Sequence, residues 1–325
     1  MADPNLRSAL CNKDKQVCHR MISSSLIGES LVVFLYELLH ASASVSFDRK
    51  LELHPICVIN SIKNLIGDDR ENPPTALLKF AVDYLFQFEF RNNDQEKLDE
   101  VIQNGIGHTV FVGELEDACQ VGDWKKAEII MSKTFIASDR SRATFDTLAE
   151  LALQSAPKNA LFIYHILRGY QFQEIKDDTW TFIKCVFDQI NKNRLDNAHK
   201  SVVITPDDIK QKIIETGDVI YFSAIERIWN GGYVRSRGYR RELSYWLSEI
   251  HFNETGITKM INDHFLIDLN KRSYINFSER IINKERTKIK KAEDLVTLEA
   301  IRYLCKNIDK NGLMNIGSRF NQLTK

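Results

Sequence analysis

The sequence predicts an all-α protein, arranged as an irregular stack of antiparallel helix pairs with a second, smaller helical unit. Only 14 Gly and 6 Pro occur among 325 residues, and 27% of the residues are charged. This composition disfavours collagen-like, disordered and turn-rich all-β chains. Apolar residues recur at helical spacing, with capping and stop residues between the segments. Because the chain is about twice the length of a usual single domain, we predict a stack over 1–200 and a C-terminal unit over 201–325.

The helices of the first unit follow from apolar periodicity and from the residues that start and stop them. Pro55 at a first turn and Gly67 after the last apolar residue delimit one helix, and Asp94 is a fair N-cap for another. The segment 26–45 is apolar nearly all round, which is typical of a buried central helix. We expect helices over residues 26–45, 55–66, 74–88, 95–103, 143–153, 157–169 and 177–190.

A helix pair is predicted most clearly between Leu115 and Met131, where Gly122 ends one helix and Asp123 caps the next. The turn resembles that of tetratricopeptide-type helix pairs, which stack to bury faces that neither helix buries alone. No repeat at a fixed 34-residue period accompanies this pair, so an irregular stack is expected in place of a regular solenoid.

The second unit begins after a polar linker over residues 191–200. The run Thr205-Pro-Asp-Asp208 combines a capping residue, Pro at the first helical position and two acids near the positive end of the helix dipole. It therefore predicts a helix start. Gly231-Gly232 then interrupts the helical pattern.

A basic cluster with two aromatic neighbours follows this break. It consists of Arg235, Arg237, Arg240 and Arg241, with Tyr233 and Tyr239. Such a cluster can bind phosphate or RNA through charge and stacking. A solvated loop or a salt-bridge patch between the units explains it equally, and the chain has no net charge. Nucleic acid is therefore not the expected partner.

The chain start and the cysteines indicate a cytoplasmic protein. The first residues lack the basic and apolar regions of a secretory signal. The most apolar segment carries Glu29, Glu37 and His40, which are costly in a bilayer, so no membrane insertion is expected. Six scattered cysteines are typical of reduced thiols, because a disulfide framework needs a denser pattern.

Histidines supply the candidate site. His40, His54, His108 and His165 fall in apolar helical context, and the last three recur at similar intervals. Imidazoles that project inward from separate helices build metal sites in helical bundles. Glu37 and His40, three residues apart, can bind one ion together. The sequence therefore predicts a site for iron or another divalent metal, although ordinary buried histidines remain an open alternative.

A family resemblance supports the same interpretation. The segments Leu53–Asn60, Gly107–Val110 and Tyr164–Ile166 resemble the questin-oxidase-like group and related helical domains found beside Rieske modules, over about residues 50–170. The resemblance implies an oxidative enzyme in which His54, His108 and His165 face inward. The Cys-His pairs that would hold a Rieske cluster do not occur in the sequence.

Two classes of function follow. The first is a metal-dependent oxidoreductase that acts on a small organic substrate. The second is a helical-repeat scaffold that binds a protein or peptide without catalysis. The sequence contains no phosphate loop, no dinucleotide fingerprint, no G-x-S-x-G elbow and no H-E-x-x-H. No nucleotide cofactor is therefore indicated.

Overall fold

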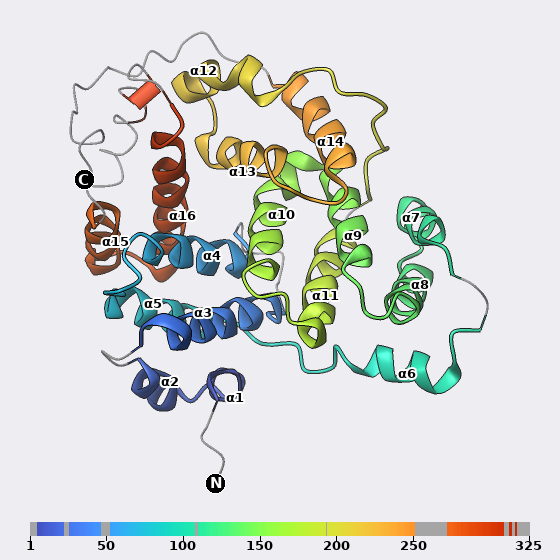
Figure 1. Cartoon of the computed structure of the whole chain (residues 1–325), viewed down its shortest axis with the longest axis horizontal. Coiled ribbons are helices and arrows are strands. Elements are labelled where there is room, and N and C mark those ends of the chain that lie inside the picture. Colours follow the sequence, from blue (N-terminus) through green and yellow to red (C-terminus); the bar gives the residue numbers. More distant parts are fainter. Residues whose placement is uncertain are drawn as a thin grey trace.

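A computed structural model describes residues 5–22, 26–46, 53–107, 110–192, 194–250, 272–308, 312–313 and 316. Within these ranges the regular elements are helices, accompanied by one isolated bridge between Val45 and Phe90. The all-α prediction is confirmed (Figure 1). No helix in this part of the chain is long and apolar enough to cross a membrane. All six cysteines are free thiols.

The helices before residue 200 lie close to the predicted bounds. α4 starts at Pro55 and is followed by Gly67, as expected, and His54 occupies its N-cap. The helices are α1 (Leu6–Cys11), α2 (Lys15–Met21), α3 (Gly28–Ala43), α4 (Pro55–Ile66), α5 (Thr75–Leu85), α6 (Glu96–Asn104), α7 (Val112–Val121), α8 (Trp124–Ala137), α9 (Ala143–Leu153), α10 (Ala156–Tyr170), a 3₁₀ turn η1 (Lys176–Asp178) and α11 (Thr179–Ile190).

The helices after residue 200 are α12 (Pro206–Thr216), α13 (Val219–Trp229), α14 (Ser236–Ser248), α15 (Ser273–Asn283) and α16 (Lys288–Cys305). The predicted start of α12 is confirmed, because Thr205 and Asp208 form a reciprocal capping box. The predicted break at Gly231-Gly232 separates α13 from α14.

The predicted turn between Leu115 and Met131 joins α7 to α8. Gly122 adopts a left-handed conformation with φ +80°, which glycine tolerates best. The side chain of Asp123 accepts a hydrogen bond from the Lys126 backbone N–H at 3.2 Å and caps α8. Both roles predicted for this turn are confirmed.

Two local predictions were wrong. Asp94 does not cap α6, whose N-cap is Gln95 without a side-chain hydrogen bond. The Asp94 carboxylate instead accepts bonds of 2.8 and 2.9 Å from the Arg91 guanidinium, and a bidentate charged pair is stronger than a single cap. Phe88 is buried but lies beyond the end of α5.

One core joins the helices on both sides of residue 200. α4 packs against α3, α10 and α16, while α13 packs against α10 and α16. Figure 1 shows one of these contacts, in which the blue α4 and the red α16 lie side by side. Buried residues from α3 to α16 belong to a single hydrophobic cluster. Side chains from distant parts of the sequence therefore line the space between these helices.

Candidate ligand-binding cavity

A cavity of about 1060 Å³ is lined by residues of α3, α4, α10, α13 and α16 and of the turns beside them. This volume is at the upper end of the range for small-molecule sites. The α3 side supplies an aliphatic wall that includes Leu31, Val32 and Leu35. Aromatic rings from other elements add to the lining: Tyr164, Phe172, Tyr233 and Tyr303. The cavity thus offers apolar surface over much of its wall.

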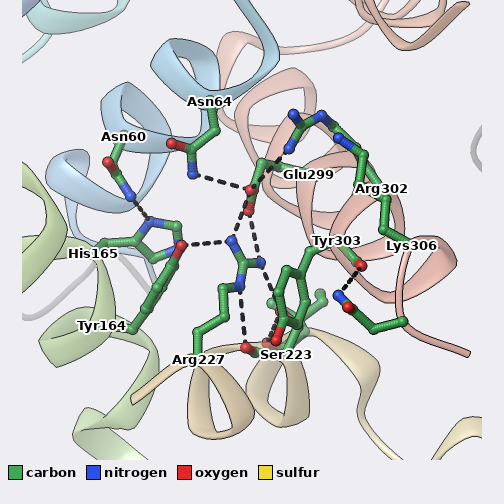
Figure 2. Close-up of polar contacts among 12 residues, drawn as sticks. Asn60, Asn64, Tyr164, His165, Ser223, Arg227, Glu299, Arg302, Tyr303 and Lys306 are labelled. Atoms are coloured by element: carbon green, nitrogen blue, oxygen red, sulfur yellow. Dashed lines mark hydrogen bonds and ion pairs between the residues drawn. The ribbon is translucent and has the colours of Figure 1, made fainter. Parts of the chain in front are cut away.

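Arg227 on α13 is the centre of a charged cluster in the cavity wall. Its guanidinium donates bonds of 2.7 and 2.9 Å to the two carboxylate oxygens of Glu299 on α16. It also lies 4.4 Å from the ring centroid of Tyr164 and 4.3 Å from that of Tyr303. Figure 2 shows Arg227 among these side chains. The arrangement fixes α10, α13 and α16 relative to one another.

Glu299 is charged despite its burial. Its side chain is only 1% exposed, and burial alone would raise its pKa. The positive charge and hydrogen bonds of Arg227 outweigh this effect and lower the pKa of Glu299 to about 2. Asn64 of α4 donates a further 3.0 Å bond to the same carboxylate. Both oxygens of the carboxylate therefore accept hydrogen bonds from the protein.

Lys63, in the last turn of α4, is the unusual group in this cavity. The residue is 7% exposed, and its Nζ lies 4.9 Å from the ring centroid of Phe172. Among the described residues, no side chain or backbone group forms a hydrogen bond or ion pair with this amine. Burial, with a further contribution from the charge of Arg168, lowers the pKa of Lys63 to about 7.

The charges that line the cavity do not balance. Two cations are neutralised by the protein, because Arg227 pairs with Glu299 and Arg302 pairs with Asp68. Three further cations line the same cavity, namely Lys63, Arg70 and Arg168. Within the ranges that the structure covers, none of these three has an ion pair. Arg168 donates one hydrogen bond of 3.3 Å to the neutral side chain of Gln171. Glu71 is a further carboxylate in the lining. The three cationic groups outnumber it, so the cavity carries an excess of positive charge.

Sequence reasoning missed these residues, although a signal was present. Lys63 and Arg227 each lie inside a segment that is otherwise largely apolar and buried. A charged residue in such a segment indicates either a buried pair or a functional group. The pattern could not show that both side chains face one cavity, because that depends on how α4 and α13 pack.

The predicted histidines contact different protein groups. His54 Nδ1 accepts a 3.2 Å bond from the Ile56 backbone N–H, and its Nε2 lies 3.5 Å from Cys185 Sγ. His165 Nδ1 lies 2.9 Å from Asn60 Nδ2, which donates to it. Burial lowers the pKa of His54 well below its usual value and that of His165 to about 3. Both imidazoles are neutral. His108 lies outside the described residues.

Glu37 and His40 belong to one network around Asp178. The Arg7 guanidinium bridges the carboxylates of Glu37 and Asp178, with N to O distances of 2.6 and 2.7 Å. His40 Nε2 lies 3.5 Å from Asp178 Oδ1 and 3.2 Å from Thr181 Oγ1. Glu37 and His40 thus both lie on α3 and reach this network, in which the Arg7 guanidinium binds the Glu37 carboxylate.

No group of three or more His, Cys, Asp or Glu side chains suited to a metal ion occurs among the described residues. His108 does not belong to these residues, so the metal site stays a prediction. Elemental analysis of purified protein, with Ala in place of His54, His108 or His165 in turn, tests it directly.

The basic cluster lies on α14 and at its N-terminal end, and most of its arginines bind other groups of the protein. Arg235 Nη2 binds Glu116 at 2.8 Å, and Arg241 Nη2 binds Glu150 at 2.9 Å. Arg240 Nε donates to the Trp229 carbonyl at 2.9 Å. The two salt bridges agree with the salt-bridge alternative, because they attach α14 and its N-terminal end to α7 and α9 of the first unit.

These observations define an all-helical protein with a cationic, partly aromatic cavity between its central helices. The chain matches no family model, no curated protein and no solved structure.

Proposed function

We propose that the protein binds a small organic anion in the cavity, with an apolar or aromatic body and a carboxylate or phosphate group. The observation that carries this proposal is Lys63, a buried amine that lines the cavity and has no ion pair among the described residues. Arg168, an exposed residue without an ion pair in the described ranges, supplies a second positive charge in the same wall. This proposal specifies the small organic molecule that the sequence predicted as one possible partner.

Electrostatics supports an anionic ligand over a neutral or cationic one. A charge in a poorly solvated site is unfavourable unless it is paired. Glu299 accepts hydrogen bonds from Arg227 and Asn64 and forms no ion pair with Lys63, so its charge only partly opposes the lowered pKa of that amine. A ligand anion would supply the missing partner, and hydrogen bonds to charged groups contribute about 1.5 to 3 kcal/mol each.

The lining of the cavity favours a ligand whose main part is apolar. Aliphatic side chains of α3 and the rings of Phe172, Tyr233 and Tyr303 line the same space. Burial of apolar surface stabilises a complex by roughly 25 cal/mol per Å². A small inorganic anion would leave this surface in contact with water. An aromatic carboxylate or phosphate ester matches both parts of the site.

We expect 2-naphthoate to bind the protein at least about tenfold more tightly than 2-naphthamide, its neutral analogue, in isothermal titration calorimetry. A tenfold ratio corresponds to about 1.4 kcal/mol, less than one charged hydrogen bond. Lys63→Met and Arg168→Gln should each remove most of this preference. Both variants leave the apolar walls intact, so the affinity for the amide should stay within about twofold of wild type.

Lys158→Met is the matched control, because Lys158 is an exposed residue on α10, the helix that carries Arg168. It should bind both compounds as the wild type does. Phenyl phosphate and benzoate extend the test to a phosphate and a smaller ring. The proposal would be wrong if the carboxylate and the amide bound equally well, or if no anion of this panel bound saturably.

The oxidoreductase and scaffold hypotheses stay predictions beside this one. A redox reaction on an organic anion is compatible with the cavity, but it requires the metal site that elemental analysis would test. The scaffold hypothesis rests on the α7–α8 pair, which is remote from α4 along the chain.

A further inference from the structure

The amine of Lys63 differs from an ordinary salt-bridge lysine in position and environment. It projects from the last turn of α4 into the cavity, is 7% exposed, and has an aromatic ring beside it at 4.9 Å. Arg168 and Arg227 line the same cavity. Hydrophobic surroundings and neighbouring cations are the two conditions that activate lysine as a nucleophile.

We infer that Lys63 forms an imine with a carbonyl group of the bound anion, so that the ligand is an aldehyde or ketone that also carries a carboxylate or phosphate. This inference rests on the proposed function, because the anionic group would place the carbonyl. Arg168, which has no ion pair within the described ranges, is the group that holds the anionic end. Lys63 then faces the carbonyl carbon.

The chemistry needs no group beyond the ligand. The lone pair of neutral Nζ attacks the carbonyl carbon, a C–N bond forms, and the carbonyl π electrons move to oxygen. Proton transfer from nitrogen to oxygen gives a carbinolamine, which loses water to leave C=N. The reaction is reversible by hydrolysis, and no electron is gained or lost.

The protonation state of the amine permits this step at neutral pH. Burial, assisted by the charge of Arg168, lowers the pKa of Lys63 to about 7. At pH 7.5 roughly three quarters of such an amine is neutral, against roughly one in a thousand for an exposed lysine. Its lower basicity reduces the nucleophilicity of each neutral amine. The net advantage expected over an exposed lysine is about tenfold.

Reductive trapping on the wild-type chain tests the inference. The protein is incubated at pH 7.5 with 4-formylbenzoate and sodium cyanoborohydride, whose hydride reduces an imine to a stable secondary amine. Peptide mass spectrometry then gives the labelling rate of each lysine. We expect Lys63 to be labelled about tenfold faster than exposed lysines such as Lys79, and excess 2-naphthoate to slow the labelling of Lys63 alone.

The neutral probe 4-formylbenzamide and the variant Arg168→Gln separate the two proposals. 4-Formylbenzamide should label Lys63 of the wild type more slowly than 4-formylbenzoate does. 4-Formylbenzoate should label Lys63 of the Arg168→Gln variant more slowly than Lys63 of the wild type. The labelling rate of Lys79 should be unchanged in both comparisons. If 2-naphthoate binds but formylbenzoate labels all lysines alike, the imine inference is wrong and the anion site stands. If both probes label Lys63 equally fast, the anion site is wrong and the reactive amine stands. The comparison of the two probes uses the wild-type chain, and none of these measurements depends on the folding of a Lys63 variant.

Discussion

Replacement of Arg227 by Met should lower the free energy of unfolding by about 3 to 5 kcal/mol, the usual cost of breaking a buried ion pair by removal of one partner. The Arg227 side chain is 11% exposed and that of Glu299 is 1% exposed. Without Arg227 the Glu299 carboxylate stays buried with Asn64 as its remaining close donor. Urea denaturation followed by circular dichroism measures the loss.

Two further variants test whether the loss of stability comes from the ion pair between Arg227 and Glu299. Arg237→Met removes an exposed arginine of the neighbouring α14 and should change stability by less than about 0.5 kcal/mol. The double variant Arg227→Met/Glu299→Leu removes both charges and should recover a large part of the loss, since an apolar replacement of a whole pair is often neutral. A single variant as stable as Arg237→Met would contradict the buried-pair interpretation.

Lys63 should make the stability of the protein rise between about pH 7 and pH 10. In the folded chain its pKa is lowered to about 7, mainly by burial, with Arg168 and Arg227 adding to the effect and Glu299 opposing it. The unfolded chain keeps the ordinary value of 10.5 and so binds more protons across this range. Stability therefore increases with pH there, by up to about 5 kcal/mol.

Comparison of Lys63→Met with Lys79→Met isolates this contribution. Lys79 is an exposed lysine on α5, so its variant should keep the pH dependence of the wild type. The Lys63 variant should lose the rise and be more stable than wild type at pH 7. Chemical denaturation at intervals across this range measures both curves. Parallel curves for the two variants would show that Lys63 is ordinarily hydrated in the folded state.

The sequence predicted local features well because each depends on a few neighbouring residues. Pro55 and Gly67 delimit α4, Thr205 and Asp208 cap α12, and Gly122 forms the turn between α7 and α8. Asp94 shows the limit of this reasoning. Its carboxylate matches a cap in sequence, but the Arg91 guanidinium competes for it in the folded chain.

The cavity could not be predicted in the same way. Lys63, Arg168, Arg227 and Glu299 come from four helices that are far apart in sequence, and their convergence depends on the rotation and packing of each helix. The histidine pattern had the same limit. Apolar context correctly indicated that His54 and His165 are buried, but it contains no information on which groups they contact.

The position of Glu299 has a consequence for synthesis of the protein. The carboxylate that holds Arg227 lies on α16, the last in sequence of the helices that line the cavity, whereas Lys63 and Arg168 precede it by more than a hundred residues. A ribosome must therefore release every helix up to and including α16 before this pocket can close. A shortened chain that stops before α16 would leave the Arg227 guanidinium without its carboxylate, and retention of a ligand would distinguish molecules that contain α16 from those that lack it.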